Sequence, residues 1–169
     1  MQVKNLQVTY EMNTRIQKDF MRMAIDLALE NVANGGGPFG AVIVRDGEVV
    51  ATGVNRVTAN NDPTAHAEVS AIRSACEKLG TFQLDGCEIY SSCEPCPMCL
   101  GAIYWAHISR LYYGCNQKDA DAVGFGDNFI YRELALDASE RQLKTQELLP
   151  EEAIKVFEAW SSKTDRIEY

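Results

Sequence analysis

Two short motifs, thirty residues apart, carry the side chains of this chain that are best suited to bind a metal ion. His66 and Glu68 form the first motif, and Cys96 and Cys99 form the second. Each motif lies where a helix is predicted to begin, and residues three apart project from one side of a helical turn. The partial positive charge at a helix N-terminus lowers the pKa of a thiol and favours the thiolate that a metal requires. One metal ion can bind both motifs only in a fold that brings these two helix starts together.

The candidate ligands His66, Cys96 and Cys99 number one fewer than tetrahedral zinc needs. Three protein ligands with a fourth position for water are typical of catalytic rather than structural zinc sites. Glu68 lies near such a metal but is displaced from the ligand direction, so it can take a proton from water and return it to a substrate. We therefore predict a hydrolytic enzyme with one Zn²⁺ per chain and Glu68 as its catalytic residue.

Cys93 leaves a second interpretation of the cysteine cluster open. If Cys93 also binds the metal, the site is a closed structural zinc centre or part of an iron–sulfur site, and the chain is an interaction module rather than an enzyme. The segment before Glu94 and Pro95 should be extended, which points Cys93 away from the other two cysteines. A structural centre also has no use for Glu68, whose alternative role is that of a charge at a helix N-terminus.

Composition predicts a single globular domain over residues 1–169, with a polar N-terminal extension at 1–12 and a C-terminal tail at 163–169 that could act as a lid. Hydrophobic residues make up 46% of the chain, yet no apolar run reaches the length of a membrane span. The first residues lack the apolar core of a secretory signal, and six cysteines without such a signal argue for reduced thiols. We therefore expect a cytoplasmic protein without a membrane partner. The net charge of −8 opposes non-specific binding to nucleic acid.

Hydrophobic periodicity predicts alternating strands and helices. Apolar residues from 16 to 27 mark one helical face, with Thr14 as its N-cap. Asp46 and Gly47, between two apolar runs, predict a hairpin with a type I′ turn. The later predicted elements are a helix after residues 62–64, strands at 87–91 and 111–113, a helix at 95–105, a weaker strand at 142–148 and a helix from Pro150 through Trp160. This order predicts the α/β class, with a three-layer α/β/α arrangement around a mixed, mostly five-stranded sheet.

The pattern His-x-Glu followed by Pro-Cys-x-x-Cys is the known signature of zinc-dependent nucleobase deaminases. The chain resembles the cytidine deaminase superfamily along nearly its whole length. Within that superfamily it is similar to the bacterial guanine deaminases at residues 37–44, 92–105 and 129–133, and in ending on a tyrosine. The resemblance implies a cytidine deaminase-like fold, zinc-dependent hydrolysis of guanine to xanthine and ammonia in purine metabolism, and a homodimer in which the C-terminal segment can be exchanged.

The same resemblance implies which residues contact the purine. These residues are Phe39, Asn55, Ala67, Trp105, Asp127 and Tyr169. An asparagine offers a donor and an acceptor to a purine edge, aromatic walls suit a flat heterocycle, and the terminal tyrosine would close over the pocket. One departure is Gly126, which stands where the family has a second acid. Apart from Ala67, each of these residues also has a structural interpretation without a substrate contact. Asn55 could form a turn, and Phe39 and Trp105 could pack in the core. Asp127 could be a solvated loop residue, and Tyr169 a frayed chain end.

Two other deaminase activities, on adenosine in tRNA and on cytosine, would share the metal centre. A tRNA deaminase is expected to present basic residues to the RNA backbone from its last helix. Residues 137–169 instead contain eight acidic and five basic residues, a net charge of −3. Such a tail is poorly suited to RNA, so a small purine is the preferred substrate and nucleic acid is not an expected partner.

Overall fold

The computed structural model describes residues 2–168, with side chains described from residue 14 onward, and the chain divides into two compact units. The first unit spans Met1–Asp127 and the second spans Asn128–Tyr169. The predicted metal ligands all belong to the first unit. The single domain over residues 1–169 stays a prediction.

The first unit is built on a mixed four-stranded sheet in the order β2-β1-β3-β4. β1 is antiparallel to both of its neighbours, whereas β3 and β4 are parallel. The turn between β1 and β2 contains Asp46 and Gly47 with φ angles of 53° and 79°, as the predicted type I′ turn requires. The strands are β1 (Gly40–Arg45), β2 (Glu48–Val54), β3 (Cys87–Cys93) and β4 (Arg110–Cys115).

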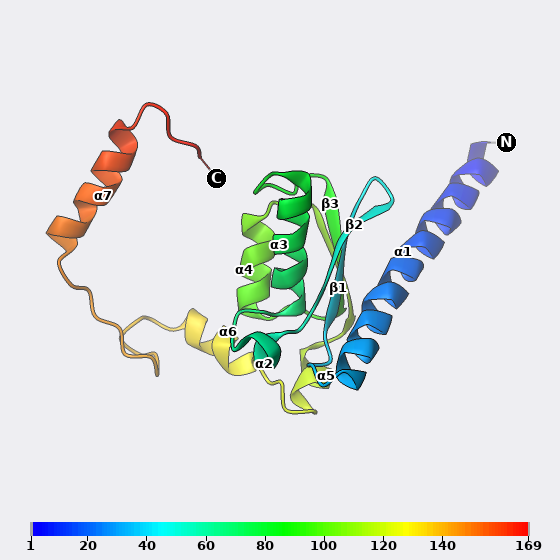
Figure 1. Ribbon diagram of the computed structural model, residues 1–169, viewed down its shortest axis with the longest axis horizontal. Coiled ribbons are helices and arrows are strands. Elements are labelled where there is room, and N and C mark those ends of the chain that lie inside the picture. The colour runs from blue at the N-terminus through cyan, green and yellow to red at the C-terminus, as the bar shows by residue number, and fades with distance from the viewer. Residues whose placement is uncertain (1, 169) are drawn as a thin grey trace. The chain divides into compact units, whose positions relative to one another are not determined.

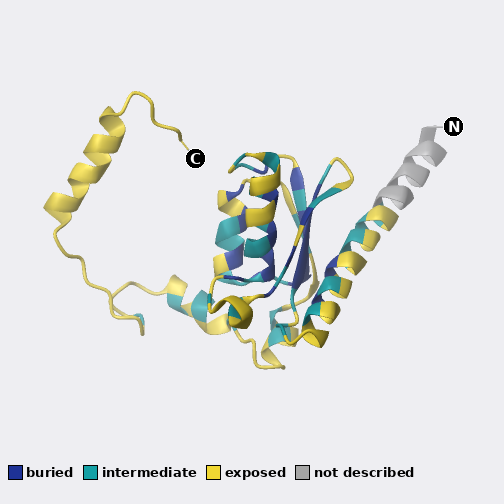
Figure 2. Ribbon diagram, in the orientation of Figure 1, coloured by how far each residue is buried: buried dark blue, intermediate teal, exposed yellow. Residues whose placement is uncertain are grey.

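Helices cover both faces of this sheet and give the predicted three-layer arrangement (Figure 1). α1 (Gln2–Ala33) packs against one face, where Ala24 and Tyr90 belong to the same buried cluster. α3 (Ala67–Leu79) and α4 (Pro97–Trp105) lie over the opposite face and a second buried cluster. Figure 2 shows that the buried residues gather on the strands and on the helix faces turned toward them. The predicted α/β class and its three-layer arrangement are therefore confirmed.

Two glycines allow these helices to approach the sheet closely. A Cβ atom on Gly40 would collide with the backbone carbonyl of Ala24 in α1. A Cβ atom on Gly53 would collide in the same way with the carbonyl of Ala67, the first residue of α3. Because Ala67 directly follows His66, the missing side chain at Gly53 helps to set the position of the first metal-binding motif.

Two predicted elements differ from the structure. α1 already begins at Gln2, so Thr14 lies inside the helix and is not its N-cap. Residues 142–148 do not form the expected strand; they lie in the second unit, where no strand occurs among the described residues to pair with them. The sheet consequently has four strands rather than five. The short helices of the first unit are α2 (Val57–Asn60) and α5 (Gln117–Asp121).

The second unit consists of α6 (Asn128–Ala135) and α7 (Pro150–Ser162), joined by a segment without helix or strand. α7 begins at Pro150, as the sequence predicts, because proline suits the first helical position. Every residue of α7 is exposed (Figure 2). Among the helices of the described residues, none combines the length and the apolar character that crossing a bilayer would require.

Candidate metal centre and active site

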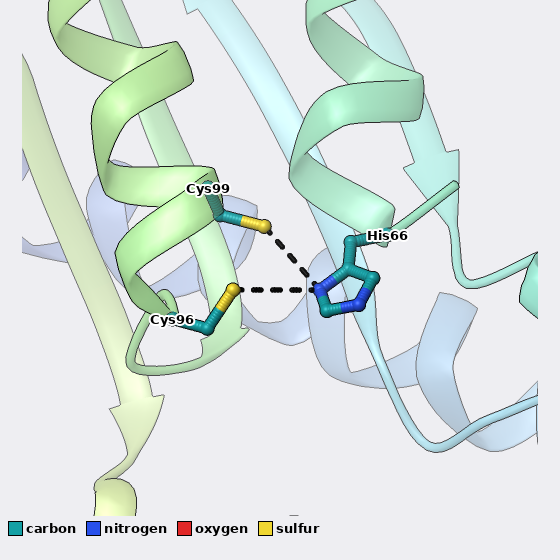
Figure 3. A group of neighbouring side chains, drawn as sticks. All are labelled: His66, Cys96 and Cys99. Atoms are coloured by element: carbon teal, nitrogen blue, oxygen red, sulfur yellow. Dashed lines mark hydrogen bonds between the residues drawn. The ribbon is translucent and has the colours of Figure 1, made fainter. Parts of the chain in front are cut away.

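His66, Cys96 and Cys99 converge between the starts of α3 and α4 (Figure 3). His66 is the N-cap residue of α3, Cys96 is the N-cap residue of α4, and Cys99 lies in the first turn of α4. The Nδ1 atom of His66 lies 3.6 Å from Cys96 Sγ and 3.4 Å from Cys99 Sγ. The three potential ligand atoms all lie within 4.8 Å of one another. The fold thus joins the two helix starts as the motif spacing requires.

The local sequence explains why both helices begin at these ligands. Cys96 has an extended backbone, with φ −65° and ψ 167°, and Pro97 then occupies the first helical position. His66 is likewise extended, with φ −69° and ψ 161°. Upstream of His66, the Asp62 carboxylate accepts hydrogen bonds from the backbone N–H (2.8 Å) and the hydroxyl (2.7 Å) of Thr64. Both ligand side chains are therefore presented from short, ordered turns.

The chemistry of this donor set fits zinc. Hydrogen bonds from Cys99 and His66 lower the pKa of Cys96 to about 4, so the Cys96 sulfur is a thiolate at neutral pH. One imidazole and two sulfur ligands are a preferred zinc set, and three protein ligands leave one coordination position for water or substrate. The predicted zinc ligands His66, Cys96 and Cys99 thus form a donor set that suits an open, catalytic zinc site.

Glu68 lies in the first turn of α3, beside the metal ligands, and its side chain is buried. Burial raises the pKa of Glu68, and both Cys96 and Cys99 are close enough to influence that pKa. Ser91 Oγ, in β3, donates a hydrogen bond of 3.2 Å to Glu68 Oε1. A buried carboxyl whose pKa is raised can hold a proton at some steps and release it at others, which suits general acid–base catalysis.

Cys93 lies outside the group of potential ligands. Its sulfur is directed toward the backbone carbonyl of Asn116, at 3.9 Å. Burial raises the pKa of Cys93 to about 11, so it is a neutral thiol at physiological pH. These observations favour the open three-ligand centre over the closed alternative.

Three of the predicted substrate contacts, Phe39, Asn55 and Ala67, lie in the first unit. Ala67 directly follows His66 and is fully buried. Asn55 is buried just after β2, and its backbone N–H donates a 3.1 Å hydrogen bond to the carbonyl of Phe39. The Phe39 ring meets Phe125 edge to face, with the ring centroids 5.0 Å apart. The structure therefore joins Phe39 to Asn55 through the backbone.

The other three predicted substrate contacts are Asp127, Trp105 and Tyr169, and they differ in burial and location. Asp127 Oδ1 is buried without a hydrogen-bond partner among the described residues. Burial raises the pKa of Asp127, and charge on Cys96 raises it further. Trp105 is the last residue of α4, at the opposite end of that helix from the ligands, and is 66% exposed. Tyr169 lies outside the described residues.

Sequence reasoning missed two residues that touch the site. Ser91 contacts Glu68, and Asn31 in α1 donates a 2.9 Å hydrogen bond to the backbone carbonyl of Asn55. Neither residue belongs to a motif, and their partners are 23 and 24 residues away in the sequence. Only the folded chain brings these pairs together.

Comparisons with known proteins agree with this geometry. Residues 14–115 match the family described as the cytidine and deoxycytidylate deaminase zinc-binding region. The guanine deaminase of Bacillus subtilis (strain 168) is 52% identical over 151 residues, which cover 89% of this chain and 97% of that protein. An X-ray structure of guanine deaminase from Bacillus subtilis superposes with a TM-score of 0.88 and 51% identity, over 90% of this chain and 98% of that chain.

A tRNA-specific adenosine deaminase from Agrobacterium fabrum (strain C58 / ATCC 33970) is also similar, with 50% identity over 93 residues. That match covers 55% of this chain and 61% of the Agrobacterium protein. Two observations indicate the same family: the zinc-type cluster formed by His66, Cys96 and Cys99, and the family match over residues 14–115. The chain belongs to the cytidine and deoxycytidylate deaminase zinc-binding family.

Proposed function

We propose that this chain hydrolyses guanine to xanthine and ammonia. The observation that carries this proposal is the 52% identity to the guanine deaminase of Bacillus subtilis, which is maintained over 89% of this chain. A match of 151 residues is longer than the first unit and must include part of the second. A tRNA-specific adenosine deaminase from Buchnera aphidicola subsp. Baizongia pistaciae (strain Bp) matches the same share of this chain, 89%, but with only 33% identity. The activity on the free base is therefore favoured over the activity on tRNA.

Glu68 is the residue that moves protons in the proposed reaction. Zinc held by His66, Cys96 and Cys99 supplies Lewis-acid chemistry that makes water reactive near neutral pH. Glu68 takes one proton from the water that attacks C2 of guanine and passes it to N3. As the C2–N bond breaks, Glu68 transfers the second proton of that water to the amino group, which leaves as ammonia. The raised pKa of Glu68 supports this role, because its carboxyl must be protonated and deprotonated in turn.

In the proposed reaction, the base is held by the six predicted contact residues. Asp127 Oδ1, which lacks a hydrogen-bond partner among the described residues, accepts from an N–H group on the purine edge. Asn55 donates to the base, the backbone of Ala67 orients it, and Phe39 packs on its flat face. Trp105 and Tyr169 complete the pocket as further aromatic walls, Tyr169 as a lid.

We infer that the protein works as a homodimer in the cytoplasm. α7 leaves Ile154, Phe157 and Trp160 exposed by 51%, 68% and 41%, at spacings that put them on one helical face. Soluble monomers rarely expose apolar surfaces of this kind, so a second copy is expected to cover them, with exchange of the C-terminal segment as one arrangement. All six cysteines are free, as a reducing compartment requires. Light scattering should give the dimer mass, and a monomer mass would contradict the inference.

A substrate panel tests the proposed function. Zinc-loaded protein is given guanine, cytosine, cytidine, adenine and tRNA separately, and ammonia release is measured as kcat/KM for each. Guanine is expected to exceed every other substrate, because the net charge of −8 disfavours polyanions and the similarity to a guanine deaminase favours a free purine base. Faster release from tRNA or cytosine would overturn the proposal.

A further inference from the structure

Asn31, in the last turns of α1, connects two segments that carry predicted substrate contacts. Its side-chain Nδ2 donates one hydrogen bond of 2.8 Å to the backbone carbonyl of Gly37 and another of 2.9 Å to the backbone carbonyl of Asn55. Gly37 lies two residues before Phe39 in the loop between α1 and β1. A single side-chain amide therefore joins the loop that carries Phe39 to the residue predicted to bind the base.

The loop is shaped to fit closely around the two asparagine side chains. A Cβ atom on Gly36 would collide with the side chain of Asn31. A Cβ atom on Gly37 would lie 3.0 Å from both Cγ and Oδ1 of Asn55. Neither glycine has the positive φ angle that favours glycine, so the requirement is one of space and not of backbone conformation. The loop could not lie this close to either asparagine if it carried side chains at these two positions.

These contacts fix Asn55 on several sides. Its backbone N–H donates to the Phe39 carbonyl, and its backbone carbonyl accepts from Asn31. Its side-chain Oδ1 accepts a hydrogen bond of 3.3 Å from the backbone N–H of Val57. With the oxygen engaged in this turn, the Asn55 amide is oriented so that its Nδ2 is the group available to donate to a substrate.

We propose that Asn31 is a positioning residue for base recognition, which acts by holding Asn55 and the Phe39 loop in their binding arrangement before the substrate arrives. The inference rests on the proposed function for the identity of the base. A polar contact that is already ordered binds its ligand without a further entropic cost of ordering. This role needs both hydrogens of Asn31 Nδ2, because each is donated to a backbone carbonyl, one of Gly37 and one of Asn55. A carboxylate oxygen in the place of Nδ2 could donate to neither carbonyl.

The substitution Asn31→Asp tests this role, because aspartate keeps the shape of the side chain and lacks both donors. The KM for guanine is expected to rise by about tenfold or more, since both backbone carbonyls lose their donor and Asn55 is no longer held in place. The value of kcat is expected to stay within about threefold, because lost uniform binding raises KM alone. Zinc content should stay at one ion per chain, because Asn31 does not touch the ligands.

Gln17→Glu is the matched control on the same helix. Gln17 Nε2 donates a 2.8 Å hydrogen bond to the hydroxyl of Tyr112, so the control makes the same amide-to-acid change at a contact outside the active site. The KM and kcat of Gln17→Glu should equal those of the wild type.

Gly37→Ala is a second variant that should disturb Asn55, because its methyl group would press on Asn55 while Asn31 stays intact. It should raise KM as Asn31→Asp does.

A double-variant cycle shows whether Asn31 acts through Asn55. Asn31→Asp should add little to the KM of Asn55→Ala, because the group that it positions is already absent. An unchanged KM in Asn31→Asp, or a full additional increase of KM in the Asn55→Ala background, would overturn the inference.

If the wild type shows no activity on guanine, the proposed function fails and the inference about Asn31 needs a separate test. Hydrogen exchange at residues 36–39 and 55–57 then still tests Asn31, since it should be faster in Asn31→Asp and unchanged in Gln17→Glu; equal exchange would contradict the role.

Discussion

At the scale of single residues, the site depends on a carboxyl group, Glu68, and a thiolate, Cys96, whose pKa values are shifted in opposite directions. Glu68 is buried and its pKa is raised, whereas the pKa of Cys96 is lowered to about 4 by its neighbours Cys99 and His66. Because the two pKa values are shifted in opposite directions, Glu68 can carry a proton beside Cys96, which binds the metal as a thiolate. Each role can be tested with a substitution that preserves the shape of the side chain.

Glu68→Gln removes the proton-carrying group and keeps nearly the same volume. The amide can still accept a hydrogen bond from Ser91, so folding and zinc content should match the wild type. The kcat for guanine should fall by at least the roughly 10²–10⁴-fold that general acid–base groups contribute. Turnover close to that of the wild type would remove Glu68 from the mechanism.

Cys93→Ser distinguishes the open metal centre from a closed one. Because the Cys93 thiol is neutral below a pKa of about 11 and faces Asn116, its replacement should leave one zinc per chain. Cys96→Ser is the control, and it should lose zinc because the thiolate ligand is gone. Metal analysis of the purified variants decides the point, and substoichiometric zinc in Cys93→Ser would support a fourth ligand.

The ligands were predictable from the sequence, and their supporting residues were not. His66, Cys96 and Cys99 lie at helix starts in a spacing that has a chemical reason, so the pattern can be recognised along the chain. Asn31 and Ser91 act through partners more than 20 residues away, and an isolated asparagine or serine has no distinctive spacing. Tertiary packing alone gives these two residues their roles.

At the scale of elements, the metal centre depends on how closely α3 lies to β2. Gly53 in β2 faces the carbonyl of Ala67, and Ala67 follows the ligand His66. The strand-and-helix order was predictable because the hairpin turn and the helix-opening prolines are local signals. The strand expected at residues 142–148 was wrong, because weak alternation in a polar segment cannot form a strand without a partner.

Gly53→Ala tests the close approach of α3. The added methyl group would collide with backbone rather than with a flexible side chain, so α3 must shift, and overpacking of this kind costs about 1–3 kcal/mol. Chemical denaturation should show that loss, together with weaker zinc binding because His66 moves with the helix.

Gly101→Ala, in α4, is the matched control for Gly53→Ala. No atom lies within 4 Å of the place where its Cβ would stand, so the same change should stabilise the protein by about 0.5–1 kcal/mol through helix propensity. Equal effects of the two substitutions would contradict the account of Gly53.

At the scale of the whole molecule, the chain combines a first unit that contains the buried core with a second unit whose described residues are mostly exposed (Figure 2). The first unit contains every zinc ligand and Glu68, whereas residues 163–168 are exposed and contribute no core. Tyr169 follows them as the proposed lid. The sequence suggested this role through its terminal tyrosine.

Deleting residues 167–169 tests the lid. Because exposed tail residues add little to folding, the melting temperature and the zinc content should stay nearly unchanged. The kcat/KM for guanine should fall by at least about tenfold, which is about 1.4 kcal/mol of transition-state stabilisation. Full activity of the shortened chain would show that Tyr169 is a terminal residue without a role in catalysis.

The central claim is that this chain adds water to C2 of guanine and releases ammonia. The most direct measurement is mass spectrometry of the product formed from guanine in ¹⁸O-labelled water by the zinc-loaded wild type, with His66→Ala as the inactive control. The account predicts xanthine that carries one ¹⁸O atom, formed in the same amount as ammonia. Guanine that remains unconverted, or xanthine without the label, would contradict it.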